Sequence, residues 1–200
     1  SNYDAKSTRQ PANILRALGT PCIIHQPKFS LMDQNHISSG ALQACIDEGI
    51  GTIAFSALAQ GLLTGKYLGG IPQGSRATQG KSLNPDAIND KTLAKLNQLN
   101  AIAARRGQTL AQMAIAWLLG NKGVTSALIG ASRPEQIADC VGALASLNFE
   151  ATELAELAHA AAGDAASCWR WLRASAMWRR ATCSQPSRSA RVRATRKTRG

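Results

Sequence analysis

Residues 39–56, SGALQACIDEGIGTIAFS, pass from helical spacing to a short apolar strand within a few positions. Leu42 and Ile46 recur at the spacing of one helix face, and Gly49 ends that helix before the apolar run 52–56. A helix followed at once by a short apolar strand is typical of a β/α unit, the repeating element of parallel sheets.

The same alternation extends along the chain. We expect helices over residues 6–18, 39–48, 91–105, 110–119, 134–146 and 151–160, strands over 22–26, 52–56 and 124–129, and a long loop over 57–90. The strands are apolar runs without alternation, which is typical of strands buried on both faces. An open doubly wound sheet and part of a (β/α)8 barrel both fit this order, but the G-x-G-x-x-G fingerprint of the doubly wound class is absent.

Three strands are too few to close a barrel of eight, and they leave two unpaired edges. The chain opens on the loop-like residues 1–4 with no strand ahead of them. We therefore expect a segment to be missing upstream, and we do not expect this chain to fold stably by itself.

The composition is that of a globular protein, with 44% hydrophobic and 18% charged residues. No apolar run approaches the roughly 20 residues of a membrane span, and we expect no signal peptide, since no charged-then-apolar pattern is seen. The five cysteines form no C-x-x-C pair, and no Cys, Asp or Glu stands at ligand spacing from His25, His36 or His159. We therefore expect free thiols in a cytoplasmic protein, no metal site, and His25 as a hydrogen-bonded core residue.

The positive charge is concentrated in the last forty residues. Residues 1–160 hold 13 basic and 11 acidic groups, whereas residues 161–200 hold 10 basic groups, nine of them Arg, and one acid. We expect residues 161–200 to be a disordered, low-complexity tail outside the folded domain, and its Arg- and Ala-rich composition favours a frameshift near residue 160. The alternative is a basic arm that binds nucleic acid through its Trp and Arg side chains.

In parallel β/α folds, ligands lie at the carboxyl ends of the strands. Ser132 and Glu135, after the last strand, form a capping-box pattern whose helix start, together with Arg133, favours an anion. The glycine-rich loop carries Lys66 and Arg76, and a mobile loop with two cations could fold over a pyrophosphate. The alternatives are that Ser132 and Glu135 only cap a helix, and that the glycine-rich loop is a solvated surface loop.

Two further side chains follow strands. Phe55 can stack on a flat ring, although a lone aromatic there is more often part of the core. Gln26 can hydrogen-bond an amide through its carbonyl oxygen and its NH2 group.

Taken in order, these stretches resemble the aldo-keto reductase superfamily, in particular the branch of bacterial glyceraldehyde-3-phosphate-type reductases and potassium-channel β-subunits. The resemblance runs from Ser1 to about Ala160 and rests on the motifs SNY (1–3), HQP (25–27), FSALAQGLLTGKY (55–67), GIP (70–72) with Ser75-Arg76, and IGASRPEQ (129–136). It implies the C-terminal half of a (β/α)8 TIM barrel, from the end of strand five to helix eight.

The resemblance also implies NADP(H) as the cofactor, bound across the carboxyl ends of the strands. The implied contacts are Ser1, Asn2 and Gln26 for the carboxamide, Phe55 for the nicotinamide ring, Ser56, Leu58, Gln60, Gly61, Lys66 and Arg76 for the pyrophosphate, and Gly130, Ser132, Arg133 and Gln136 for the adenosine 2′-phosphate and adenine.

The implied reaction reduces an aldehyde or ketone to an alcohol. The family's catalytic Asp, Tyr, Lys and His belong to the first half of the barrel, so we expect no catalytic residue in this chain and no activity from it alone. A non-catalytic NADP-sensing regulatory subunit is the alternative, and the sequence leaves homo-oligomer formation open.

Overall fold

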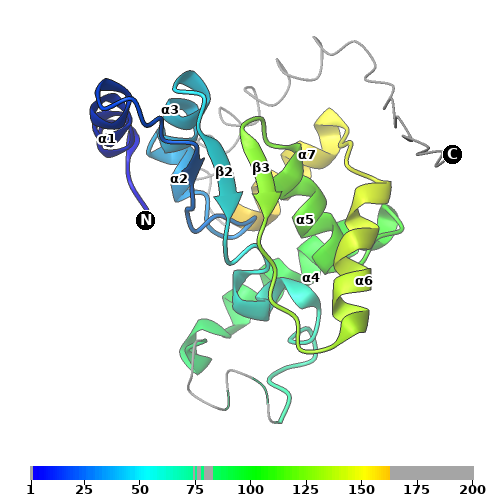
Figure 1. The fold of residues 1–200 in the computed structure, drawn as a ribbon. Helices are drawn as coiled ribbons and strands as arrows, with labels where there is room; N and C mark the ends of the chain where they lie inside the picture. Colours follow the sequence, from blue (N-terminus) through cyan, green and yellow to red (C-terminus); the bar gives the residue numbers. More distant parts are fainter. Residues whose placement is uncertain (1, 74, 76–77, 79–82, 163–200) are drawn as a thin grey trace, which may run out of the picture.

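The computed structural model describes residues 2–73, 75, 78 and 83–162. Figure 1 shows an α/β fold with one parallel sheet. Its elements in chain order are α1 Ala5–Ala17, β1 Ile24–His25, α2 Asn35–Ser38, α3 Ala41–Asp47, β2 Gly51–Ala54, η1 Ala59–Thr64, η2 Pro85–Ala87, α4 Asp90–Arg105, α5 Leu110–Gly120, β3 Val124–Ala127, α6 Pro134–Gly142, η3 Ala143–Ala145 and α7 Ala151–Ala162.

The sheet has the strand order β1-β2-β3, and both pairs are parallel. His25 pairs with Thr52, and Ala54 pairs with Ala127, with a register shift between Thr52 and Ile53. The three predicted strands are thus confirmed in order and direction, although each is shorter than its apolar run.

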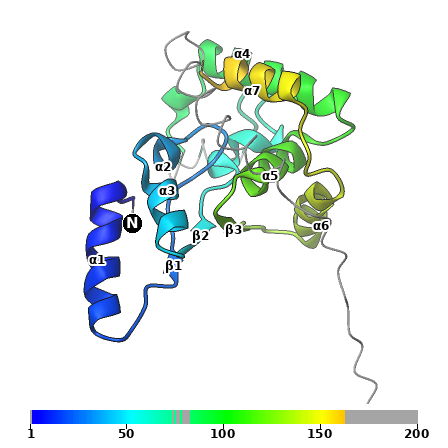
Figure 2. The same ribbon diagram turned by 90° about the horizontal axis from the view of Figure 1, so that it is seen from above.

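Buried helices lie on one side of this sheet (Figure 2). Helix α5 begins with a capping box between Thr109 and Gln112, and residues around its whole circumference are buried, as its apolar sequence predicts. Helices α4 and α7 pack on the far side of α5 from the sheet. Helices α1 and α3 lie side by side, and Arg9 pairs with Asp47 at 2.6 Å.

The expectation that the strands are buried on both faces is wrong. Ile23 and Ile24 at the β1 edge are 67% and 52% exposed, and both central residues of β3 are exposed. The reason is that the described helices cover one face of a sheet too small to close on itself, so the other face and both edges have no described partner (Figure 2).

All but one of the predicted helices begin and end within two residues of their predicted bounds, but the predicted long loop over 57–90 contains the 3-10 helices η1 and η2. Helix α2 carries no periodic signal in its four residues and is missed by the sequence analysis. The helix predicted over 134–146 ends at Gly142 and continues as the 3-10 turn η3.

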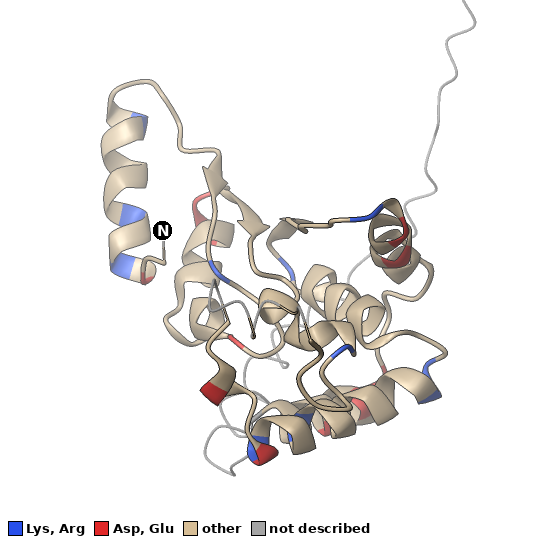
Figure 3. Ribbon diagram, turned by 90° about the horizontal axis from the view of Figure 1, so that it is seen from below, with Lys and Arg blue, Asp and Glu red and all other residues tan. Residues whose placement is uncertain are grey.

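Charged residues of both signs are interspersed over the described helices (Figure 3). Apart from the end of α7, the predicted basic tail at 161–200 lies outside the described residues. None of the described helices has the combined length and hydropathy that crossing a bilayer requires.

Candidate functional site at the carboxyl edge of the sheet

The segments that follow the three strands are hydrogen-bonded neighbours. The Phe55 amide donates to the Pro27 carbonyl at 3.0 Å, and the Phe29 amide donates to the Phe55 carbonyl at 3.2 Å. On the other side, the Leu128 amide donates to the Ala54 carbonyl at 2.8 Å. The carboxyl ends of β1, β2 and β3 therefore meet at one edge, as the parallel order requires.

Several predicted site residues lie at this edge. The Oδ1 atom of Asn2 accepts a hydrogen bond from the Lys28 amide at 2.8 Å, which ties the start of the chain to the segment after β1. Gln26 and Gly130 are exposed, and Phe55 is partly exposed. Ser1 lies outside the described residues.

The turn after β2 has a strained backbone. Ser56, Ala59 and Gln60 have φ values of 55°, 48° and 58°, and Gly61 follows with 98°. Left-handed non-glycine residues are uncommon, and clusters of them gather at binding sites, where surrounding contacts hold them. Here the amide of Gly61 donates to the carbonyl of Leu58 at 2.9 Å, which fixes this turn.

Lys66 lies over this turn. A Cβ placed on Gly61 would lie 3.3 Å from its Nζ, and the same Nζ lies 4.8 Å from the centre of the Tyr67 ring. Tyr67 and Leu63 are fully buried, so this part of the loop is anchored in the core. Arg76 lies outside the described residues.

The start of α6 differs from the predicted capping box. The N-cap residue is Arg133, without a side-chain cap, and Ser132 lies one position too early to cap the helix with Glu135. Instead, the amide and hydroxyl of Ser132 donate to the Oε1 atom of Gln136 at 2.8 and 3.3 Å. The reason is that the long Gln136 side chain reaches back and holds Ser132 outside the helix. The first turn of α6 therefore begins without a side-chain cap, at the exposed residue Arg133.

The structure also brings together three residues that the sequence analysis kept apart. The nitrogen and sulfur donors of His25, His36 and Cys45 lie within 4.8 Å of one another. They lie where β1 meets helices α2 and α3. Burial lowers the pKa of His25, and burial with the nearby His25 lowers the pKa of His36 to about 4. Burial raises the pKa of the Cys45 thiol. Sequence spacing gives no signal for this cluster, because its members come from β1, α2 and α3.

His25 is buried as predicted, but its Nε2 atom has no hydrogen-bond partner among the described residues, so the expectation of a fully hydrogen-bonded core residue is wrong for that atom.

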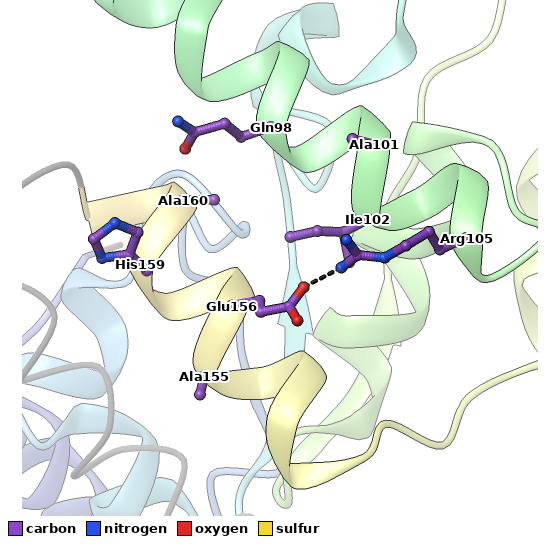
Figure 4. A pocket seen from close by; sticks show the side chains of 8 residues that line it. All are labelled: Gln98, Ala101, Ile102, Arg105, Ala155, Glu156, His159 and Ala160. Atoms are coloured by element: carbon purple, nitrogen blue, oxygen red, sulfur yellow. Dashed lines mark hydrogen bonds and ion pairs between the residues drawn. The ribbon is translucent and has the colours of Figure 1, made fainter.

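A cavity of about 510 Å³ opens between α4 and α7 (Figure 4). Its lining residues are Gln98, Ala101, Ile102, Arg105, Ala155, Glu156, His159 and Ala160. This cavity lies in the outer helical layer, on the side of α5 away from the sheet, and none of its residues belongs to the predicted site. Arg105 and Glu156 form an ion pair beside it.

Comparison with known proteins agrees with this architecture. The model of the Aldo/keto reductase family matches residues 1–162. The chain is 42% identical over 174 residues to an L-glyceraldehyde 3-phosphate reductase of Escherichia coli K12, and 41% identical over 174 residues to that of Escherichia coli O157:H7. Both matches cover 85% of this chain and 50% of the relative.

A probable voltage-gated potassium channel subunit beta of Oryza sativa subsp. japonica is 39% identical over 136 residues, which cover 66% of this chain and 41% of that protein. The chain thus spans about half the length of the curated relatives it matches. By the match of nearly its whole described length, the chain belongs to the Aldo/keto reductase family of oxidoreductases.

Proposed function

We propose that residues 1–160 are the C-terminal, nucleotide-binding half of a (β/α)8 barrel, running from the end of strand five to helix eight of an NADP(H)-dependent aldo-keto reductase. The half-length match to relatives supports this division. Exposed apolar side chains at both edges of the sheet support it as well: Ile24 on β1, Leu128 directly after β3, and Ile137 and Val141 on α6 are each at least half exposed. Such residues are where the remaining barrel elements would pack.

The residues at the carboxyl edge fit a dinucleotide. The observation that carries the proposal is the strained turn at 56–61, held directly after β2 with the ammonium of Lys66 over Gly61. No described carboxylate forms an ion pair with Lys66 or Arg133, so both cations are available to phosphate groups. A strained turn with Lys66 over it, and a second cation, Arg133, after β3, suit an extended ligand that carries several phosphate charges.

The proposed contacts come from the start of the chain and from the segments after the three strands. Ser1, Asn2 and Gln26 orient the carboxamide, and Phe55 covers one face of the nicotinamide ring. The other contacts are Ser56, Leu58, Gln60, Gly61, Lys66 and Arg76 along the pyrophosphate, and Gly130, Ser132, Arg133 and Gln136 around the adenosine and its 2′-phosphate. The bound nucleotide supplies a hydride for the carbonyl carbon of an aldehyde or ketone substrate.

Carbonyl reduction also needs a proton donor for the developing alkoxide. We assign this role to neither tyrosine of the chain. Tyr67 is fully buried beneath Lys66, and Tyr3 lies in the segment before α1. We therefore assign proton transfer to the family's Asp, Tyr, Lys and His in the first half of the barrel. By this proposal the chain binds the nucleotide and positions it, and carbonyl reduction requires the other half.

Isothermal titration of the whole chain with NADPH and with NADH tests the proposal. We expect binding of NADPH that is tighter than binding of NADH, and no carbonyl reduction by the chain alone. A sample with native-like circular dichroism that binds neither nucleotide contradicts the proposal. Supplying the first half of a related reductase as a separate chain is expected to restore NADPH oxidation in the presence of an aldehyde.

The potassium-channel relative favours a second candidate, a cytoplasmic NADP-sensing regulatory subunit without catalytic activity. The two candidates share the nucleotide site and differ in the partner. A pull-down that retains a partner only when NADPH is present favours the regulatory subunit.

A further inference from the structure

The layer between the sheet and helices α2 and α3 contains an unusual pair of buried imidazoles. His25 and His36 are 8% and 4% exposed, and their rings stack with centroids 5.2 Å apart and an interplanar angle of 17°. Neither Nε2 atom has a hydrogen-bond partner among the described residues. Buried polar atoms are nearly always paired, so two unpaired nitrogens side by side call for a ligand that both can bind.

A thiol completes this group. Cys45 on α3 is fully buried and is not in a disulfide, and its Sγ atom and one nitrogen of each imidazole lie within 4.8 Å of one another. Zinc binds nitrogen at 2.0–2.1 Å and sulfur at about 2.3 Å, so tetrahedral donors stand roughly 3.3–3.6 Å apart. The donor atoms, which now lie within 4.8 Å of one another, therefore have to move closer by roughly 1 Å to bind the ion.

The donor set indicates the kind of ion. Two imidazole nitrogens and one thiolate suit zinc, cobalt and copper, whereas magnesium and calcium require oxygen donors. The hydroxyl of Thr52 on β2 neighbours the Cys45 thiol, and Thr52 is fully buried. It can fill the fourth position or orient a water molecule there.

We propose that His25, His36 and Cys45 bind one zinc-class transition-metal ion, which ties β1 to α2 and α3 behind the sheet. The site is distinct from the proposed nucleotide site: His25 faces the helices, whereas the next residue, Gln26, is exposed at the carboxyl edge. Binding replaces the thiol proton with the metal and satisfies both orphaned nitrogens.

Titration of the tag-free whole chain with Co2+ tests the proposal, after chelator treatment and in a phosphine reductant. We expect one equivalent to produce a thiolate-to-cobalt charge-transfer band in the near ultraviolet with visible bands of a tetrahedral site, and Zn2+ to bleach both. Cys45→Ser is expected to abolish the charge-transfer band. The matched control is Cys140→Ser, which changes another buried thiol, on α6, and is expected to keep it.

A charge-transfer band that survives in Cys45→Ser, or is lost in Cys140→Ser, overturns the proposal. If Cys45→Ser does not fold, the wild-type chain decides: its thermal midpoint rises with Zn2+ and not with Mg2+ if the site exists. A folded wild-type chain that shows neither a cobalt band nor a zinc-dependent rise also overturns it. Because neither readout uses a nucleotide, failure here leaves the NADPH titration unaffected.

Discussion

The ammonium group of Lys66 lies over Gly61, close enough that a Cβ on Gly61 would be 3.3 Å from both Cε and Nζ of the lysine. Gly61 also has φ +98°, which side chains rarely adopt. Because Gly61 has no side chain, the turn can adopt its left-handed backbone and the Lys66 ammonium can lie directly above it.

Gly61→Ala is expected to lower the free energy of unfolding by about 1–2 kcal/mol, because alanine is strained in left-handed backbone, and to weaken NADPH binding by displacing Lys66. Urea denaturation and NADPH titration measure the two effects. Gly69→Ala is the control, since a Cβ there meets nothing within 4 Å and the backbone is not left-handed. Equal behaviour of the two variants would refute the role given to Gly61.

Lys66→Gln is expected to weaken binding of NADPH and NADH alike, by roughly tenfold to a hundredfold, because a charge-assisted contact to the shared pyrophosphate is lost. The effect should shrink as salt is raised. Lys122→Gln removes another exposed lysine, two residues before β3 and thus at the opposite end of the strands. If both variants lose the same nucleotide affinity, Lys66 acts only through the net charge of the protein and not through a contact to the pyrophosphate.

Arg133→Gln is expected to separate the two nucleotides. The 2′-phosphate is present in NADPH and absent from NADH, so the variant should lose roughly tenfold or more in NADPH affinity and little in NADH affinity. Competition titrations give the ratio of the two dissociation constants. A ratio unchanged from that of the wild-type chain would place the 2′-phosphate away from the start of α6.

The pH dependence of stability is expected to report on His36. Its pKa is about 4 in the folded chain against 6.5 as the ordinary value, because burial disfavours the charged ring. Between pH 6.5 and 4 the unfolded chain takes up a proton that the folded chain refuses, so stability falls as the pH falls, by about 1.4 kcal/mol per pH unit from this group. The stacked ring of His25 acts in the same direction.

Urea denaturation across this pH range, with a chelator present, measures the slope. His36→Gln should flatten it, whereas a change of the exposed His159 to Gln should not. A slope that is the same in all three proteins would contradict a neutral, buried His36.

Two neighbouring arginines differ in burial, and we expect their replacement by alanine to lower the free energy of unfolding by different amounts. Arg106 is 5% exposed, pairs with Glu153 at 2.7 Å, donates to the Asn148 carbonyl at 2.9 Å and lies 3.7 Å above the Phe149 ring. Arg105 pairs with a glutamate of α7 as well, but both side chains are more than half exposed.

Arg106→Ala is therefore expected to lower the free energy of unfolding by about 3–5 kcal/mol, since it removes the cation from the partly buried Glu153 carboxylate, which among the described residues keeps only the Glu150 amide, and removes a donor from the Asn148 carbonyl. Arg105→Ala is expected to cost at most about 1 kcal/mol. Denaturation midpoints compare the two, and similar losses would show that burial does not decide the difference.

Much of the local structure could be predicted from the sequence. The capping box before Leu110, the all-round apolar surface of α5 and the order of three parallel strands follow from patterns within a few residues. Candidate residues such as Gln26 and Phe55 could be predicted from the same patterns. Once a parallel strand is recognised, the residues that directly follow it are candidates for ligand binding.

Contacts between distant residues depended on packing. The sequence offers Ser132 as a helix cap, but the Gln136 side chain takes its hydroxyl instead. Ile137 and Val141 form an apolar stripe that helical spacing assigns to a core, yet both are exposed because no described element covers them.

By itself, the sequence determined which segments are helices, which are strands and which polar residues follow each strand, because these properties depend on neighbours within one or two turns. Only the tertiary structure decided that His25, His36 and Cys45 share one buried layer. The physical reason is that the distance between residues on separate elements is set by how whole helices pack on a sheet, and no spacing along the chain records it.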